Sequence, residues 1–176
     1  MIQYAPRDRE NALRSLSRQA VLVAAGEIGH GEIGENNAGP HVDRYRNGKG
    51  GRGSWCAHFV SWCYEEACRR RSLMPLWPHE AGAKKLARSI AEIGGWVDVE
   101  AGDVPLPGDV ICWHRRPWGS WHGHIAFVDA YGLDADRLTV IDGNHGSFPA
   151  AVDRRDINRG MWRAHLYGVA RIWAAG

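Results

Sequence analysis

The spacing of apolar residues changes near residue 100, and this change restricts the folds open to the chain. Before that point apolar residues recur every three or four positions, as they do on one face of a helix. After it the apolar segments are short, rich in β-branched and aromatic residues, and separated by turn sequences such as Pro107-Gly108-Asp109. Helices that come first and strands that follow indicate an α+β fold with an antiparallel sheet.

Three amphipathic helices are predicted in the first part of the chain. The first covers Asn11 to Ile28, the second starts near Ser54 and carries Cys56 in its first turn, and the third begins at Ala83 and ends before Gly94. The stretch of residues 29–53 holds eight glycines and no sustained period, so we expect a long irregular connection there. Loops of that length are often functional.

The later part of the chain is expected to form the sheet. The predicted strands are Val110 to Trp113, His124 to Ala130, Leu138 to Asn144 and Val169 to Trp173. Because the chain has 176 residues and a domain typically has about 150, we expect one domain over residues 1–176. Its helical part would run from about 8 to 95 and its sheet part from about 105 to 175.

Composition excludes several classes of protein. The 22 Lys and Arg residues nearly balance the 20 Asp and Glu residues, so we expect no nucleic-acid partner. No apolar run approaches the roughly 18 residues needed to span a bilayer. The run from Ala20 to Ala25 is short and follows a polar, helix-like segment, so we expect no signal peptide. The four cysteines form no CxxC pair, and we expect mostly free thiols.

Cys56 has the position of a reactive cysteine. In the first turn of a helix, unpaired backbone N–H groups and the positive end of the dipole favour a thiolate over a thiol. The glycines before it allow close approach of a substrate, and the Cys56 amide has the place of an oxyanion donor. Taken alone, Cys56 fits a buried structural cysteine equally well, because free cysteine is among the most buried residue types.

His124 is the candidate base for that thiol. If the connection after its strand turns near residues 133 and 134, antiparallel pairing places His124 opposite Asp142 or Asn144. Either side chain would orient the second ring nitrogen, as a Cys/His pair requires. The alternative is a hairpin with incidental polar groups on its surface.

Other residues near His124 suggest a metal site or a binding groove. His114, His122 and His124 lie close to Cys112, which suggests zinc, but standard ligand spacings are absent and we predict no metal. The substrate-binding residues that we predict instead are tryptophans, of which Trp113 could equally pack in the core. They are Trp55, Trp113, Trp118 and Trp121.

Four successive motifs resemble those of CHAP domains, which are cysteine- and histidine-dependent amidohydrolases and peptidases of the NlpC-type, papain-like group. They are residues 55–62 (WCAHFVSW), 107–110 (PGDV), 123–128 (GHIAFV) and 140–144 (VIDGN), in the order and spacing of the family. Upstream, residues 27–29 (EIG), 32–33 (EI) and 37–45 (NAGPHVDRY) resemble the leader of one bacterial and phage branch. The resemblance covers roughly residues 20 to 172.

The resemblance implies a papain-like fold in which the helix carrying the cysteine packs on an antiparallel sheet. It implies Cys56 as nucleophile and His124 as base, with Asp142 orienting His124 and Asn144 aiding it or the oxyanion. Some phage relatives bind calcium through closely spaced aspartates before the cysteine. Here that loop has Asn36, Asn37 and Asp43, so we expect neither a required metal nor another cofactor.

The function expected from the resemblance is hydrolysis of an amide bond in bacterial peptidoglycan, either N-acetylmuramoyl-L-alanine or a stem or crossbridge peptide. Two alternatives remain open: hydrolysis of a small amide metabolite, and a degenerate module that binds wall peptides without cutting them. We expect a monomer unless the chain belongs to a phage tail or injection assembly. We also expect delivery to the periplasm or cell wall by a holin, a tail or a secretion system.

Overall fold

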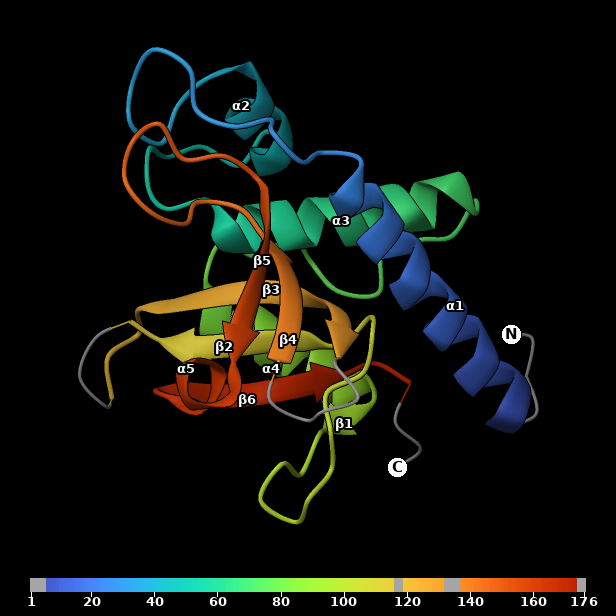
Figure 1. Ribbon diagram of the computed structural model, residues 1–176. Coiled ribbons are helices and arrows are strands. Elements are labelled where there is room, and N and C mark those ends of the chain that lie inside the picture. The colour runs from blue at the N-terminus through green and yellow to red at the C-terminus, as the bar shows by residue number, and fades with distance from the viewer. Residues whose placement is uncertain (1–5, 116–118, 132–136, 174–176) are drawn as a thin grey trace.

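The computed structural model describes residues 6–115, 119–131 and 137–173 (Figure 1). Its helices are α1 (Pro6–Ala25), α2 (Pro40–Arg46), α3 (Cys56–Arg70), α4 (Ala83–Ile93) and α5 (Arg159–Arg163). Its strands are β1 (Gly95–Trp96), β2 (Val110–His114), β3 (Gly123–Tyr131), β4 (Arg137–Asp142), β5 (Asp153–Asn158) and β6 (Leu166–Arg171). The strands form one sheet in the order β1-β6-β2-β3-β4-β5, and every pairing is antiparallel.

The sheet has a hydrophobic core on each face. Residues of α1, α3 and α4 form the larger core together with Ile125 and Phe127 of β3. Ala126 and Val128, which alternate with them along the same strand, belong to the smaller core with Trp162 of α5. Figure 1 shows α3 lying across one side of the sheet with α1 beside it. The predicted α+β fold with a central helix on an antiparallel sheet is therefore confirmed.

Helix α3 is buried on most of its circumference, which fixes where its first residue lies. Trp55, the residue before the helix, holds its N-terminus in place. The Trp55 ring packs directly against the backbone of Gly143, which follows β4 and has no side chain. A Cβ built on Gly143 would lie 2.2 Å from that ring. Further along the helix, the Tyr64 hydroxyl hydrogen-bonds to Ser17 of α1 at 3.0 Å. The start of α3 is thus set against the end of the sheet.

The sequence did not predict four elements. Helix α2 lies within the stretch expected to be irregular, and with seven residues it is too short to show a helical period. Strand β5 is a mostly exposed edge strand rich in charged residues, so it has no apolar alternation to detect. The short elements β1 and α5 were missed as well, and the last strand spans 166–171 rather than 169–173.

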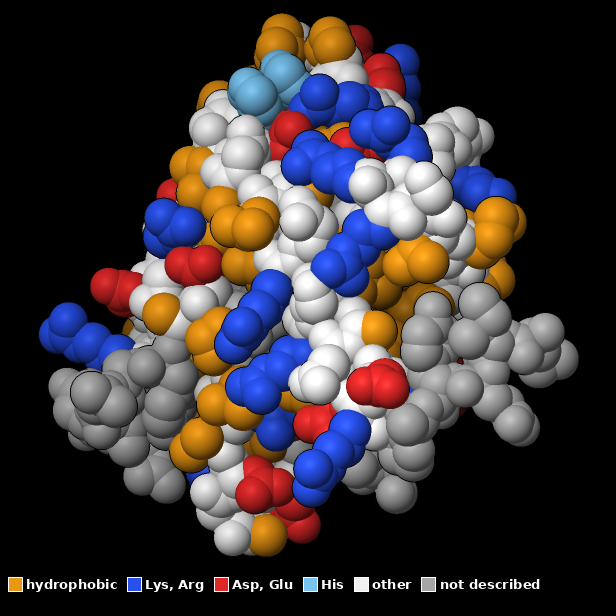
Figure 2. Space-filling model, turned by 90° about the vertical axis from the view of Figure 1, so that its right-hand side faces the viewer, with side chains coloured by type: hydrophobic (Ala, Val, Ile, Leu, Met, Phe, Trp, Pro, Cys, Tyr) orange, Lys and Arg blue, Asp and Glu red, His pale blue; other side chains and the backbone are white. Residues whose placement is uncertain are grey.

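The face that α1 covers carries several exposed basic side chains. Arg7, Arg9, Arg14 and Arg18 are all exposed on this helix. Figure 2 shows Lys and Arg side chains in a broken band on this side of the molecule, with hydrophobic and acidic side chains between them. In Figure 1 this side lies opposite the N-terminus of α3.

Within the described residues, no helix combines the length and the apolar character needed to cross a bilayer.

Candidate active site

Cys56 is the first residue of α3, and its thiol lines a pocket of about 280 Å³. The glycines at 50, 51 and 53 line the same pocket. Burial raises the pKa of the Cys56 thiol, but the hydrogen bond with His124 and the positive charges of His124 and Arg115 lower it. A backbone hydrogen bond with Ile125 lowers the pKa further, so that it lies below the ordinary value. The site therefore favours a thiolate.

His124 stands between the thiol and a carboxylate. Its Nε2 lies 2.7 Å from Oδ2 of Asp142, and both side chains are buried. Burial lowers the pKa of His124, but the hydrogen bonds with Asp142 and Cys56 raise it above its usual range. Because Nε2 is bonded to Asp142, the proton that His124 exchanges with the thiol moves through Nδ1, which Arg115 also contacts at 3.0 Å.

The pairing of β3 with β4 explains this contact. Phe127 pairs with Ile141 and Val128 with Val140, which is the register expected for a turn near residues 133 and 134. By the same alternation His124 lies on the side of the sheet that carries Ala126, and its ring stacks on Trp113 of β2 at 5.9 Å between centroids. The side chain two residues from the position opposite His124 is that of Asp142, and this diagonal neighbour supplies the carboxylate.

Arg155 of β5 holds Asp142 from its other side. Its Nε lies 3.1 Å from Oδ1 of Asp142, and its Nη2 donates to Oδ2. Burial raises the pKa of Asp142, but the hydrogen bonds from His124 and Arg155 lower it below its ordinary value. Asp142 is therefore an ionised carboxylate that accepts from both neighbours. Arg155 was not predicted as a site residue, because the strand that carries it has no apolar alternation.

Arg115 also contacts the site without having been predicted. It follows the last residue of β2, and its Nη2 lies 3.0 Å from Nδ1 of His124 and 3.1 Å from the carbonyl oxygen of Asn144. Asn144 is buried in a left-handed conformation with φ 60°. Of the two predicted orienting residues, Asp142 contacts His124, while Asn144 contacts the site through its backbone carbonyl.

Two pockets adjoin at Arg115. The first is the pocket that holds Cys56. The second has a volume of about 530 Å³ and is lined by His124, Trp113 and Arg155 among others. Arg115 lines both. A substrate that reaches Cys56 therefore has space on either side of the thiol and the imidazole.

The four tryptophans predicted to bind substrate lie in different environments. Trp55 is fully buried in the core and its Nε1 donates to Glu32 at 3.0 Å, so the structure places it in the core and not on the wall of either pocket. Its ring is needed to fix the start of α3, which explains the burial. Trp113 lines the 530 Å³ pocket, and Trp121, 77% exposed, lines the Cys56 pocket. Trp118 lies outside the described residues.

A second chain of imidazoles ends at the Cys56 pocket. Nδ1 of His58, two residues after Cys56, lies 2.9 Å from Nε2 of His79, and Nδ1 of His79 lies 2.9 Å from Oε1 of Glu65. Burial lowers the pKa of His58 to about 4, and the charges of His79 and Arg46 add to that effect. His58 lines the pocket, and its lowered pKa keeps the ring neutral at neutral pH. Sequence reasoning missed this chain, because His79 and His58 meet only in the folded protein.

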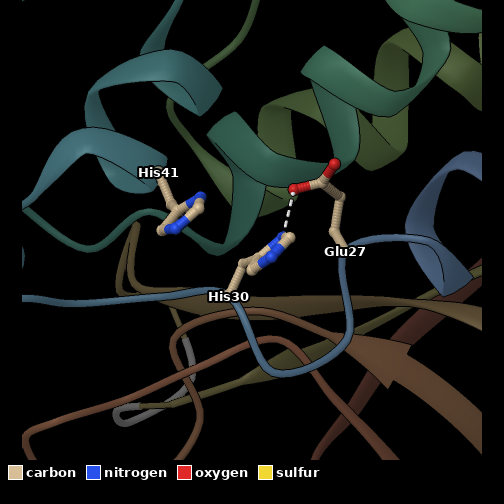
Figure 3. A group of neighbouring side chains, drawn as sticks. All are labelled: Glu27, His30 and His41. Atoms are coloured by element: carbon tan, nitrogen blue, oxygen red, sulfur yellow. Dashed lines mark hydrogen bonds and ion pairs between the residues drawn. The ribbon is translucent and has the colours of Figure 1, made fainter.

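One group of three possible metal ligands lies within the described part of the chain, away from Cys112, His114, His122 and His124. It consists of Glu27, His30 and His41 (Figure 3), whose ligand atoms all lie within 4.8 Å of one another. The rings of His30 and His41 stack at 4.2 Å. The Glu27 carboxylate accepts hydrogen bonds from Arg44, Tyr45 and His30. Because a guanidinium already neutralises this carboxylate, a cation bound there would have to displace it.

Comparison with solved structures places the fold among known ones. The structure of Ly7917 matches with a TM-score of 0.53 and 16% identity over 87% of this chain and 61% of that one. Ly7917 with "the hydrolyzing product of MDP" matches with a TM-score of 0.53 and 15% identity over 88% and 62%. An NLP/P60-family protein "similar to lipoprotein" from Staphylococcus aureus subsp. aureus Mu50 has a TM-score of 0.49 and 17% identity over 92% and 42%. The chain thus spans less than two thirds of the length of each of these proteins.

Comparison by sequence gives the family. No curated protein matches the chain significantly. The family model of the CHAP domain matches residues 47–144, which is more than half of the 176 residues and runs from the loop before Cys56 to Asn144. The matched segment contains the cysteine, the histidine and the aspartate that the fold brings together. The chain therefore belongs to the CHAP domain family of cysteine- and histidine-dependent amidohydrolases and peptidases.

Proposed function

We propose that this protein hydrolyses an amide bond of bacterial peptidoglycan through a covalent intermediate on Cys56. The observation that carries the proposal is the unbroken chain from the Cys56 thiol through His124 to the buried carboxylate of Asp142, open to a pocket at the thiol. A lowered thiol pKa beside a raised imidazole pKa is what nucleophilic catalysis by cysteine requires.

The first half of the reaction acylates the enzyme. The thiolate of Cys56 attacks the carbonyl carbon of the amide, a C–S bond forms, and negative charge develops on the carbonyl oxygen. The backbone N–H of Cys56, at the start of α3, has the place of a donor to that oxygen. His124 gives its proton to the leaving nitrogen as the C–N bond breaks, and the amine departs.

The second half returns the enzyme to its resting state. His124, now neutral, takes a proton from a water molecule, which attacks the thioester and releases the acid. The proton then passes to the departing sulfur or stays on the imidazole. Asp142 orients the ring through Nε2 and stabilises the imidazolium that forms, while Arg155 keeps Asp142 ionised and in place.

Membership of the CHAP family supports the proposal that the substrate is bacterial peptidoglycan. The bond that we propose is cleaved is either the N-acetylmuramoyl-L-alanine amide or a peptide bond of the stem or crossbridge. A peptidoglycan substrate would place the action of the protein in the periplasm or cell wall, and we propose delivery there by a holin, a phage tail or a secretion system. Trp113 and Trp121, which line the two pockets, are proposed to contact the substrate.

Digestion of purified walls tests the proposal. Peptidoglycans of several stem and crossbridge types are incubated with the wild type, with Cys56→Ala and with Cys68→Ala, which removes another thiol from the same helix. The proposal expects new amine and carboxyl termini, identified by mass spectrometry, with the wild type and Cys68→Ala but none with Cys56→Ala. The position of those termini names the bond.

The other outcomes lead to different functions. If no wall yields new termini while Cys56 still alkylates rapidly near neutral pH, hydrolysis of a small amide becomes the favoured alternative, and turnover of such an amide tests it. If Cys56 also reacts no faster than an ordinary thiol, the protein is a module that binds wall peptides without cutting them.

A further inference from the structure

The 530 Å³ pocket beside His124 is lined by apolar residues such as Trp113 and Ile157 and by several cationic and imidazole side chains. Arg115 and Arg155 both line it, together with His145 and His165, and none of its described lining residues is an Asp or a Glu. Burial lowers the pKa of His145, and the charge of Arg155 lowers it further, which fits a pocket of positive potential. A pocket of this kind suits an anionic group.

The two arginines differ in how their charge is balanced. Arg155 forms an ion pair with the buried carboxylate of Asp142. Arg115 is exposed and forms no ion pair with any residue that the structure describes; its partners are the His124 ring and the carbonyl of Asn144. Both of these contacts use Nη2, which leaves the N–H groups on Nε and Nη1 to a ligand. Arg115 thus offers an unmatched charge and unused donors at the edge of the pocket.

We propose that Arg115 binds a free carboxylate of the substrate, and that the residue next to the cleaved amide carries this carboxylate. The inference rests on the proposed function and names a feature of its substrate. A guanidinium binds a carboxylate through two parallel N–H···O bonds, and the described contacts of Arg115 use Nη2 and not Nε or Nη1. Because Nη2 of Arg115 also contacts Nδ1 of His124, a carboxylate held there lies within one residue of the reacting carbon.

The chemistry of the wall offers two such groups. A stem peptide whose third residue is diaminopimelate carries free carboxylates on that residue and on its D-glutamyl residue, and either can be converted to an amide. The amide has nearly the same shape but no charge. A pair of stem peptides that differ only in this substitution therefore isolates the contribution of the carboxylate.

The test compares kcat/KM for four synthetic stem peptides: both carboxylates free, the D-glutamyl one amidated, the diamino acid one amidated, and both amidated. A hydrogen-bonded charge pair corresponds to about a ten- to a hundredfold preference. We expect the wild type to prefer the free acid by that factor at one of the two positions, which identifies the bound group. In Arg115→Gln the preference at that position should fall to near one, and in Arg115→Lys to an intermediate value.

The matched control is Arg154→Gln, which removes an exposed arginine that pairs with Asp129 and does not line the pocket. It should keep the preference of the wild type. Cleavage of all four peptides at equal kcat/KM by the wild type would overturn the carboxylate subsite and leave the proposed function standing. If no peptide is cleaved, the proposed function has failed, and calorimetric binding decides the subsite. Tighter binding of the acid that Arg115→Gln abolishes would support it, and equal binding of acid and amide would overturn it.

Discussion

Two chains of carboxylate and imidazole groups end at the pocket that holds Cys56, and their histidines have opposite acid–base properties. In one, Asp142 contacts His124 directly, and the pKa of His124 is raised. In the other, His79 stands between Glu65 and His58, and the pKa of His58 is lowered to about 4. Both histidines are buried, so burial alone does not explain the difference.

The residue in direct contact decides the outcome. A carboxylate beside an imidazole stabilises the charged ring, whereas a second imidazole offers only a neutral partner or a competing positive charge. His124 can therefore hold the proton that it takes from Cys56, while His58 remains neutral. A histidine near the thiol is therefore not by itself evidence of a catalytic base. The group hydrogen-bonded to the other ring nitrogen determines whether the imidazole can hold a proton.

The largest difference in catalytic rate is expected between variants that lack His124 and variants that lack His58. His124→Asn should lower kcat for wall-peptide cleavage by about 10⁴-fold or more, because no group remains to take the proton of Cys56. His58→Asn should lower it by less than about tenfold, since a neutral ring pointing at the pocket moves no proton. Turnover of a defined stem peptide by both purified variants measures the contrast. Equal losses would show that both chains act in catalysis.

The second contrast separates the two carboxylates. Asp142→Asn should lower kcat by about 10²- to 10⁴-fold, because it removes the charge that orients His124 and stabilises its protonated form. Glu65→Gln, at the far end of the other chain, should cost less than about tenfold. Rates are measured at saturating substrate, and circular dichroism shows whether each variant keeps its fold. A loss for Glu65→Gln as large as that for Asp142→Asn would contradict the assignment of Asp142 alone.

A smaller effect is expected in the reactivity of the thiols. An ordinary thiol with a pKa of about 8.5 is only about 1% ionised at pH 6.5. Because the Cys56 pKa is lowered, native protein at pH 6.5 should alkylate at Cys56 about tenfold faster with iodoacetamide than unfolded protein does. Peptide mapping should find Cys63 and Cys112 unmodified, since burial raises the pKa of both thiols.

The same measurement tests the link to Asp142. Without the hydrogen bond and charge of Asp142, the pKa of His124 falls, and less imidazolium is present to stabilise the thiolate. Alkylation of Asp142→Asn at pH 6.5 should therefore slow toward the rate of an ordinary thiol. An unchanged rate would mean that the helix terminus and Arg115 suffice to activate Cys56.

Much of this fold could be predicted from local patterns, and the misses have physical causes. Helix α3 and the strands β2, β3 and β4 repeat apolar residues with the period of their structure. Strand β5 does not, because its residues are mostly charged and its place is fixed by pairing with β4. An edge strand whose stability comes from its neighbour leaves little trace in its own sequence.

The residues of the candidate site also differ in whether local sequence patterns could predict them. Cys56, His124 and Asp142 could be proposed from a helix start and a strand register, which are local or nearly local features. Arg115 and Arg155 could not, because their contacts depend on where the ends of β2 and β5 lie relative to β4. The place of Trp55 also depends on a distant residue, because its ring fills the space left by the absent side chain of Gly143.

The smallest expected effect concerns stability rather than turnover, and it comes from the second chain. The folded pKa of His58 is about 4, and the unfolded value of a histidine is about 6.5. Between these values the unfolded chain binds the extra proton, so His58 contributes stability that is present above pH 6.5 and is lost as the pH falls toward 4. We expect a contribution of about 1 kcal/mol, less than the full shift implies, because water in the pocket screens the charge.

His58→Gln isolates that contribution, because glutamine keeps a polar side chain toward His79 but does not titrate. The decrease in Tm between pH 7 and pH 5 should be smaller in His58→Gln than in the wild type, by about 2–4 °C for a domain of this size. Differential scanning calorimetry of both proteins at both pH values measures the difference. Equal pH dependence in His58→Gln and the wild type would mean that His58 titrates normally. In that case the two chains would not differ in the way that their contacts imply.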